Sequence, residues 1–214
     1  MNTISLHHVT PRIFERREDL NSDVWQAEVT FEKGMTYLVE ADSGKGKSTF
    51  CSYLLGYRHD YTGEICFDAD DVSKYGISQW VAVRQRHISH LFQEMRLFPE
   101  LTAFENVEIK NRLTGLFSRE EIENSFERLG IADKLNAKAG LLSQGQQQRV
   151  ALIRAMVQPY DFLIVDEPIS HLDDVNARLM ADLIFETNLK AGGGIIVTSI
   201  GKRLPLNYDS ILKL

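Results

Sequence analysis

Residues 41–49, ADSGKGKST, combine glycine, lysine and hydroxyl side chains at the spacing G-x-x-x-x-G-K-[ST], except that the first position is Ala41. The two glycines allow backbone N–H groups to approach a phosphate closely. Lys47 can reach the β- and γ-phosphates of a nucleotide, and the Ser48 hydroxyl can ligate Mg²⁺. Alanine costs little at the first position if its φ is negative and strains the loop if φ is positive. Because the rest of the loop is intact, we expect the negative φ.

A pair of carboxylates follows the apolar run Phe162–Val165, at Asp166 and Glu167. Asp166 is placed to hold Mg²⁺ through water, and Glu167 to polarise an attacking water. Two carboxylates at a strand end are usually only solvated. Their position downstream of a phosphate loop favours the catalytic interpretation.

Residues 142–150, LSQGQQQRV, form a third group. Ser143 can cap a helix and Gln146 lies at its third position, so the pair predicts a capping box. The apolar residues that continue this helix are Val150, Ile153 and Val157. The free N–H groups at its beginning suit an anion.

Alternating and continuous apolar patterns predict the elements that position these groups. Residues 1–35 alternate, above all over 24–31, and predict antiparallel edge strands. The runs that are apolar on both faces, typical of central parallel strands, are Thr36–Val39, Phe162–Val165 and Ile195–Val197.

Helical spacing follows the phosphate loop at Phe50, Tyr53, Leu54 and Tyr57. Ser118 and Glu121 predict a capping box for a helix that Gly130 ends. Val175, Leu179 and Leu183 predict another helix, ending at 192–194. The order of elements predicts one α/β domain over 1–214: a phosphate-loop core with a parallel sheet, an N-terminal antiparallel β subdomain, and an inserted helical subdomain at about 94–158.

Composition limits the function classes. The chain has 214 residues and a net charge of −6, which argues against a nucleic-acid binder. Cys51 and Cys66 lack metal-ligand spacing and read as reduced thiols of a cytosolic protein. No apolar run approaches the ~18 residues of a membrane span, and the N-terminus does not have the pattern of a signal peptide. We therefore expect a cytoplasmic protein that contacts a membrane only through a partner.

Along the chain, the loop at 41–49 is followed by the motif at 142–150 and then by the carboxylates Asp166 and Glu167. The three motifs in this chain order resemble those of the ATP-binding cassette (ABC) ATPases, and the resemblance covers nearly the whole chain. The resemblance implies a P-loop NTPase core, ATP and Mg²⁺ as cofactors, and two cassettes paired head to tail around ATP. It implies catalytic roles for Glu167, Gln93 and Ser199, and metal roles for Ser48, Gln93 and Asp166. The nucleotide-binding residues that it implies are Phe14, Ser43, Gly44, Lys45, Gly46, Lys47, Ser48, Thr49, Ser143, Gly145, Gln146 and Asp173.

Some of these roles stay open or depart from the family pattern. Phe14 is the candidate aromatic to stack on adenine, and Trp25 competes with it. Gln144 replaces the first glycine of the signature, but because Gly145 is retained we expect binding to survive. The D-loop is expected at 170–173, where His171 reads as a contact residue. Ser199 stands where the family has a histidine beside the γ-phosphate, which predicts near-normal binding and slow turnover.

The resemblance also implies partners. The chain looks like a stand-alone ATPase subunit that docks under an integral membrane permease, on the inner face of the cell membrane. Residues 93–107 are similar to those of cassettes for lipoprotein release, macrolide efflux and cell division. In this segment Met95, Leu97, Phe98 and Leu101 form either an apolar docking surface or part of the subdomain interior.

A homodimer is favoured over a heterodimer, because one chain supplies both a phosphate loop and a signature. The alternative to a transport motor is an ATP-gated dimerisation switch with slow hydrolysis, regulating an envelope membrane complex.

Overall fold

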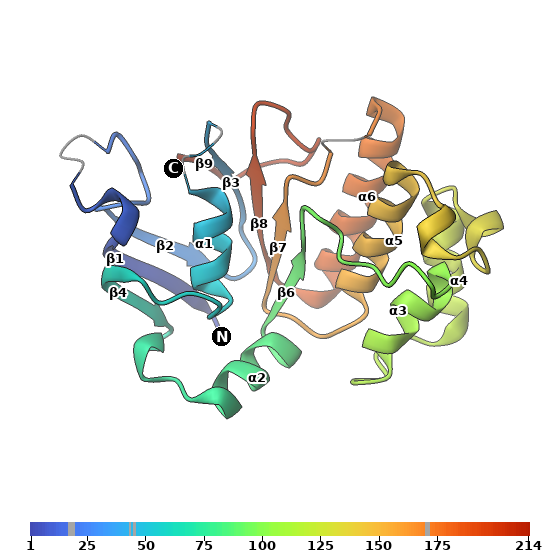
Figure 1. Ribbon diagram of the computed structural model, residues 1–214, viewed down its shortest axis with the longest axis horizontal. Helices are drawn as coiled ribbons and strands as arrows, with labels where there is room; N and C mark the ends of the chain where they lie inside the picture. Colours follow the sequence, from blue (N-terminus) through green and yellow to red (C-terminus); the bar gives the residue numbers. More distant parts are fainter. Residues whose placement is uncertain (17–19, 43, 45, 170–171) are drawn as a thin grey trace.

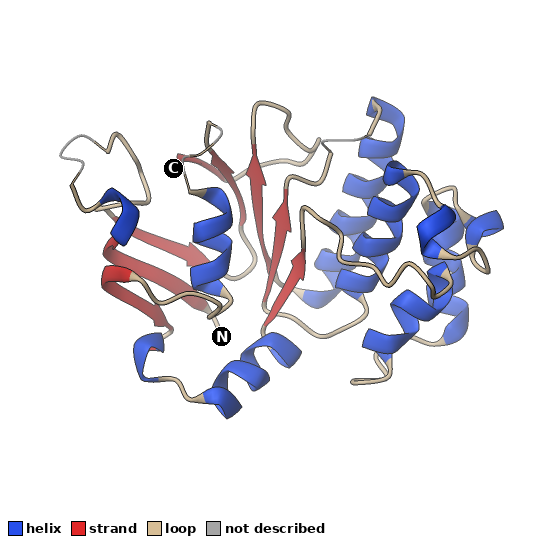
Figure 2. Cartoon of the chain, viewed as in Figure 1, coloured by secondary structure: helices blue, strands red, loops and turns tan. Residues whose placement is uncertain are grey.

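The computed structural model describes residues 1–16, 20–42, 44, 46–169 and 172–214. Helix α1 (Lys47–Leu54) lies between two β-sheets, as Figure 1 shows. Helices α5 (Gln144–Met156) and α6 (Asp174–Ala191) cover the opposite face of the second sheet, and α3 (Ala103–Asn111) and α4 (Arg119–Arg128) lie beyond them (Figure 2). The predicted α/β fold class is confirmed.

The first sheet is antiparallel and has the strand order β2-β1-β4-β5. Its strands are β1 (Thr3–Pro11), β2 (Glu28–Glu32), β4 (Tyr61–Phe67) and β5 (Asp70–Asp71). The N-terminal antiparallel strands predicted from the alternating pattern are therefore present, but only β2 is an edge strand. β1 pairs with β2 on one side and, on the other, with β4, which lies after the phosphate loop.

The alternating segment 24–31 is extended only in its second half, which corrects the predicted strand. The Ser22 hydroxyl oxygen accepts hydrogen bonds from the backbone N–H groups of Val24 and Trp25, at 3.1 and 2.8 Å. Gln26 has a φ of 60°. A local turn and a left-handed residue are both incompatible with an extended strand, so β2 begins later.

The second sheet is parallel and has the strand order β6-β7-β8-β3-β9. Its strands are β3 (Thr36–Glu40), β6 (Ile88–Leu91), β7 (Phe162–Asp166), β8 (Gly194–Ser199) and β9 (Ser210–Lys213). The three apolar runs are confirmed as the adjacent strands β7, β8 and β3. The sequence pattern misses β6 and β9 because both are short and contain polar residues.

Alternate residues of β7 enter two different cores, because successive side chains of a strand point to opposite faces. Phe162 and Ile164 pack with α1 and the antiparallel sheet. Leu163 and Val165 pack with α5 and α6. Burial on both faces fixes the strand in place, so that its C-terminal residue, Asp166, is held opposite Thr198 of β8.

Helix α1 begins at Lys47, earlier than the predicted apolar spacing from Phe50. Gly46 has a φ of 98° and its carbonyl oxygen accepts the N–H of Phe50 at 2.8 Å, the first bond of the helix. The helix ends before Tyr57, because Gly56 turns the chain with a φ of 65°. Tyr57, predicted as the last apolar position of this helix, is half-exposed outside it.

The predicted capping boxes at Ser118 and Ser143 are confirmed, and each begins its helix as expected. Gly192, with a φ of 64°, ends α6. Helix α2 (Ile77–Arg86) lies outside the predicted pattern and precedes β6. Helices α3, α4 and α5 all fall within 94–158, and the division of this range into a separate subdomain stays a prediction.

Candidate functional site

The phosphate loop lies between the end of β3 and the beginning of α1. Ala41 is absent from the described non-glycine residues with positive φ, so the first position is unstrained, as predicted. Gly44 and Gly46 have φ values of 79° and 98°, which side chains with a Cβ atom rarely adopt. The predicted contacts Ser43 and Lys45 lie outside the described residues.

Lys47 is buried, and its ammonium group already has partners at the end of the sheet. Its Nζ lies 3.4 Å from Glu167 Oε1 and donates to the carbonyl oxygen of Ala41, also at 3.4 Å. A buried cation needs such partners, because burial without one is costly. The loop therefore holds a lysine between its own backbone and the carboxylate that ends β7.

The two hydroxyl residues after Lys47 differ in their surroundings. Ser48 is exposed, so its hydroxyl can meet a metal ion. Thr49 is buried, and its hydroxyl oxygen accepts a hydrogen bond from Arg58 Nη1 at 3.1 Å. Thr49 therefore uses its side chain within the fold, and its predicted nucleotide contact is left to its backbone.

The carboxylates Asp166 and Glu167 lie beside the phosphate loop, as predicted. Asp166 is buried, which raises its pKa, and the Thr198 hydroxyl donates a hydrogen bond to Asp166 Oδ1. Gln93 Nε2 donates to Glu167 Oε2 at 3.1 Å. The catalytic candidates Gln93 and Glu167 are thus in direct contact, although they are far apart in the sequence.

Glu167 has a left-handed backbone, with a φ of 46°. Such a conformation costs a non-glycine residue roughly 1–2 kcal/mol, so the surrounding bonds must impose it. The Glu167 N–H donates to the carbonyl oxygen of Thr198 at 3.1 Å, and Gln148 Nε2 of α5 donates to the Glu167 carbonyl oxygen at 3.3 Å. Sequence reasoning misses Gln148, because nothing in the run of three glutamines indicates which of them points to β7.

Ser199 ends β8, and its catalytic role stays a prediction. It is buried, and its hydroxyl donates to the carbonyl oxygen of Lys202. Its own carbonyl oxygen accepts the N–H of Ala41 at 3.1 Å. The neighbouring Thr198, which the sequence did not single out, is the residue that contacts Asp166.

The signature serine caps α5 as predicted. Ser143 Oγ accepts the N–H of Gln146 at 3.3 Å, and Gln146 Oε1 accepts the N–H of Ser143 at 2.9 Å. Ser143 and Gly145 line a cavity of about 400 Å³ together with Asp173, which caps α6. The beginnings of two helices therefore meet in one cavity, and the Asp173 carboxylate caps one of them there.

Asp173 is fixed within that cavity by Asn176. The backbone N–H of Asn176 donates to Asp173 Oδ1 at 2.8 Å and lowers the pKa of the carboxyl group. Arg149 Nη1 donates to Asn176 Oδ1 at 2.7 Å, which ties α5 to α6. The other D-loop residues predicted from the sequence, Ser170 and His171, lie outside the described residues.

The signature and the phosphate loop line different cavities. Ala41 and Asp42 line a cavity of about 420 Å³ with Gly201 and Lys213. Ser143 lines the separate cavity at the beginnings of α5 and α6.

Both candidate aromatics for adenine lie beside Gly46. A Cβ added to Gly46 would lie 3.2 Å from Phe14 Cε2 and 3.5 Å from Trp25 Nε1. Trp25 packs edge-on against Phe50 and Tyr53, with ring centroids 6.2 and 6.1 Å away, as a core residue does. Phe14 is also buried, and its stacking on adenine stays a prediction.

The predicted apolar surface after Gln93 is divided between two environments. Met95 and Leu97 pack against the core, while Phe98 is 52% exposed. The reason is local: Met95 and Arg96 have φ values of 59° and 50°, and these two left-handed residues redirect the chain. Met95 and Leu97 therefore follow the interior alternative, and Phe98 the surface alternative.

Phe98 instead lines a groove of about 350 Å³ that we call the cationic groove. Its walls include the exposed side chains of Tyr57 and Leu113. Its cationic side chains are Arg84, Arg96, Lys110 and Arg154. Among the described residues that line it there is no Asp or Glu. Burial lowers the pKa of Lys110 to about 7 and that of Arg154 to about 10.

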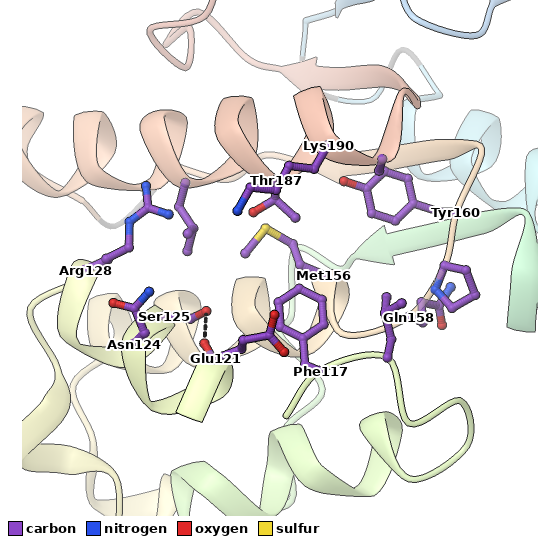
Figure 3. A pocket seen from close by; sticks show the side chains of 14 residues that line it. Phe117, Glu121, Asn124, Ser125, Arg128, Met156, Gln158, Tyr160, Thr187 and Lys190 are labelled. Carbon is purple, nitrogen blue, oxygen red and sulfur yellow. Dashed lines mark hydrogen bonds between the residues drawn. The ribbon is translucent and has the colours of Figure 1, made fainter. Parts of the chain in front are cut away.

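A further cavity, of about 390 Å³, lies between α4, α6 and the segment after α5 (Figure 3). Arg128, Thr187 and Lys190 surround it, and Tyr160 points its hydroxyl toward Thr187. Within the described residues that hydroxyl has no hydrogen-bond partner. The cavity contains none of the site residues predicted from the sequence.

Comparisons with known proteins agree with this geometry. A family model described as ABC transporter matches residues 24–170. The chain is 31% identical over 216 residues to "Uncharacterized ABC transporter ATP-binding protein YbbA" of Escherichia coli (strain K12), covering 100% of this chain and 94% of that one. It is also 31% identical over 180 residues to "Lipoprotein-releasing system ATP-binding protein LolD" of Syntrophus aciditrophicus (strain SB), covering 83% and 81%.

The chain is also similar to a solved structure, a dimeric post-hydrolysis state of the ATP-binding cassette MJ0796 bound to ADP and Pi. The match covers 92% of this chain and 87% of that one. The TM-score is 0.74 and the identity 27%. No helix in the described part of the chain is both long and apolar enough to cross a membrane. Given the phosphate loop, the signature cap and these relatives, the chain belongs to the ABC transporter family, among its ATP-binding ATPase cassettes.

Proposed function

We propose that this protein is the ATP-hydrolysing subunit of a membrane transporter, and that two copies enclose two ATP molecules. The observation that carries the proposal is the contact of Lys47 and Gln93 with Glu167 at the end of β7. In the proposed assembly, the signature Ser143 that faces this site belongs to the second copy, where it begins α5. The dimeric relative with ADP and Pi supports the same assembly.

The residues present fit Mg²⁺, which prefers oxygen ligands. Ser48 offers an exposed hydroxyl and Asp166 a carboxylate, and Gln93 retains its Oε1 because Nε2 bonds to Glu167. When bound, the metal ion would neutralise charge on the phosphates.

Phosphates that bind Lys47 would release Glu167 from its ion pair. The Glu167 carboxylate can then accept a proton from the attacking water, while Gln93 holds this carboxylate in position. Ser143 and the beginning of α5 would supply N–H groups to the outer phosphate from the second copy.

The proposed partner is an integral membrane permease, and the cationic groove is its docking site. Phe98 and Leu113 offer apolar contact, and the groove carries Arg84, Arg96, Lys110 and Arg154 without an acidic lining residue. A permease segment with an apolar anchor and acidic neighbours would complement it. The protein would then lie on the inner face of the cell membrane, held there by this partner.

The assembly is tested with Glu167→Gln, which keeps the shape of the side chain and removes the base. With ATP and Mg²⁺, we expect this variant to elute as a dimer whose mass is measured by light scattering, and to hydrolyse little ATP. Lys47→Ala is the matched control and should stay monomeric. A Glu167→Gln chain that remains monomeric with excess ATP contradicts the proposal.

The partner is tested by purification of the chain from membranes in mild detergent. We expect an integral membrane protein to co-purify with the parent chain. The two variants Arg84→Glu and Phe98→Asp, each made separately, should no longer co-purify with it but should still bind ATP. If both variants keep the same membrane protein, the groove is not the docking site.

A further inference from the structure

Three side chains with metal-ligating atoms converge behind the phosphate loop. Cys51 comes from α1, His90 from β6 and Asp166 from the end of β7. One ligand atom of each, a sulfur, a ring nitrogen and a carboxylate oxygen, lies within 4.8 Å of the other two. They come from three elements that the sheet and α1 hold together, so the cluster is a product of the fold.

His90 is the unusual member of this cluster. Both of its ring nitrogens are inaccessible to solvent, and neither has a hydrogen-bond partner among the described residues. A buried polar group without a partner costs free energy, and such groups in folded proteins need an explanation. The ring packs against Phe92, with centroids 4.1 Å apart, which fixes its position.

The remaining two ligands are also held in place. Cys51 is buried, and Asp166 accepts a hydrogen bond from the Thr198 hydroxyl. Carboxylates that bind metals are commonly oriented by such an outer-shell bond. Other atoms of His90 line the cationic groove, while its ring nitrogens face away from solvent toward the cluster.

We propose that Cys51, His90 and Asp166 bind Zn²⁺, at a site that overlaps the oxygen-ligated Mg²⁺ site at Asp166 alone. Sulfur and imidazole nitrogen are ligands that Zn²⁺ accepts and that Mg²⁺ disfavours. Ligand atoms around a tetrahedral zinc ion are roughly 3.5 Å apart, so the three side chains need only small rotations to close on it. On binding, the Cys51 thiol releases its proton to solvent and the fourth position is open to water.

This site shares Asp166 with the proposed magnesium site, so the two ions compete for one carboxylate. Zinc bound there withdraws Asp166 from the nucleotide site. We therefore expect Zn²⁺ to lower the rate of ATP hydrolysis, and we expect this inhibition to require the zinc ligands Cys51 and His90.

The site is tested with the full chain, without nucleotide, using Co²⁺ as a spectroscopic probe for zinc. We expect a sulfur-to-cobalt charge-transfer band with the visible absorption of tetrahedral cobalt, and its loss when Zn²⁺ is added. Cys51→Ser and His90→Phe should each abolish the band. Cys66→Ser changes the other cysteine and should retain it.

Thr198→Val removes only the outer-shell hydrogen bond and should weaken cobalt binding by ~10–100-fold. Far-UV circular dichroism checks that each variant is folded, and two ligand variants on different elements keep the test valid if one is not. Absence of the band in the parent chain, its survival in His90→Phe, or its loss in Cys66→Ser overturns the site.

The inhibitory effect has its own readout. Zn²⁺ should inhibit ATP hydrolysis of the parent chain more than that of Cys51→Ser, and equal inhibition would refute the link to Asp166. If the chain proved not to hydrolyse ATP, the proposed function would fail, while the cobalt titration would still decide whether the metal site exists.

Discussion

At the scale of single residues, Asp161 connects three segments of the chain just before β7. Lys33 donates to its Oδ1, and His87 Nδ1 lies 2.6 Å from its Oδ2. Burial by itself raises the pKa of Asp161, but the hydrogen bonds from Lys33, His87 and the Met1 amino group, with the charge of that group, outweigh it and lower the pKa to about 2. The carboxylate therefore stabilises the folded chain in its charged form.

Replacing Asp161 should make stability depend less on pH. Because the folded pKa is lower than the unfolded one, the contribution is present above the unfolded pKa and is lost as pH falls toward about 2. We expect Asp161→Asn to lower the free energy of unfolding at neutral pH by about 1–2 kcal/mol, after allowance for solvent screening. Urea unfolding should show this difference narrowing below about pH 5.

The matched control is Asp182→Asn, at an exposed position of α6, with an expected change within ~0.5 kcal/mol. A difference between Asp161→Asn and the parent that is the same at all pH values would contradict the assignment.

Ser199 carries a second prediction at this scale. Its hydroxyl is engaged with Lys202, and a histidine there would be longer and able to carry positive charge. We expect Ser199→His to raise the rate of ATP hydrolysis at saturating ATP and Mg²⁺ at least several-fold, with ATP affinity nearly unchanged. A rate no faster than that of the parent would count against slow turnover through Ser199.

At the scale of elements, two glycines that end helices have different surroundings. Gly56 follows α1 with a φ of 65°, and a Cβ there would overlap the indole of Trp80 on α2. Gly192 ends α6 with a φ of 64°, and a Cβ there would meet nothing within 4 Å. The same backbone conformation thus occurs once in a packed site and once in an open one.

Alanine at these two positions should separate the free-energy cost of a left-handed backbone from the cost of overpacking. Gly192→Ala adds left-handed strain alone, about 1–2 kcal/mol. Gly56→Ala adds overpacking against Trp80, about 1–3 kcal/mol more. Urea unfolding of both variants measures the difference, and equal destabilisation would mean that α1 and α2 do not pack closely at Gly56.

At the scale of the whole molecule, the phosphate loop and the signature act in different copies if the proposed dimer is correct. Lys47→Ala damages the first and Ser143→Asp the second. Aspartate keeps the ability to cap α5 and places a negative charge against the phosphates. Each variant alone should be inactive.

Mixing these two variants should restore activity, because half of the mixed dimers' sites combine an intact loop with an intact signature. Each mixed dimer has one intact site of two, so we expect recovery on the order of a quarter of the parent ATPase rate. In the control, the single variant Lys47→Ala is mixed with a double variant that carries both Lys47→Ala and Ser143→Asp. This mixture should stay inactive, because no copy in it has an intact phosphate loop. No recovery in the first mixture would argue against composite sites.

Much of the site was predictable because its motifs are local. The loop at 41–49 and the cap at Ser143 depend on residues a few positions apart. The structure confirms the helix that begins at Lys47 and the cap at Ser143. The family resemblance gave Gln93 and Glu167 catalytic roles but not their contact, since nothing local joins them. The split of Met95 from Phe98 was not predictable, because two left-handed residues reverse the apolar pattern.

The sequence by itself determined the central strands, the capped helices and the types of reactive side chain, since these follow from hydrophobic period and short-range hydrogen bonds. Only the tertiary structure decided which distant residues meet: Gln148 on Glu167, Thr198 on Asp166, and His90 beside Cys51. The physical reason is that neighbouring parallel strands bring their own ends together, although whole helices separate these strands in the sequence. Packing of those helices, rather than any local pattern, fixes which side chains face one another there.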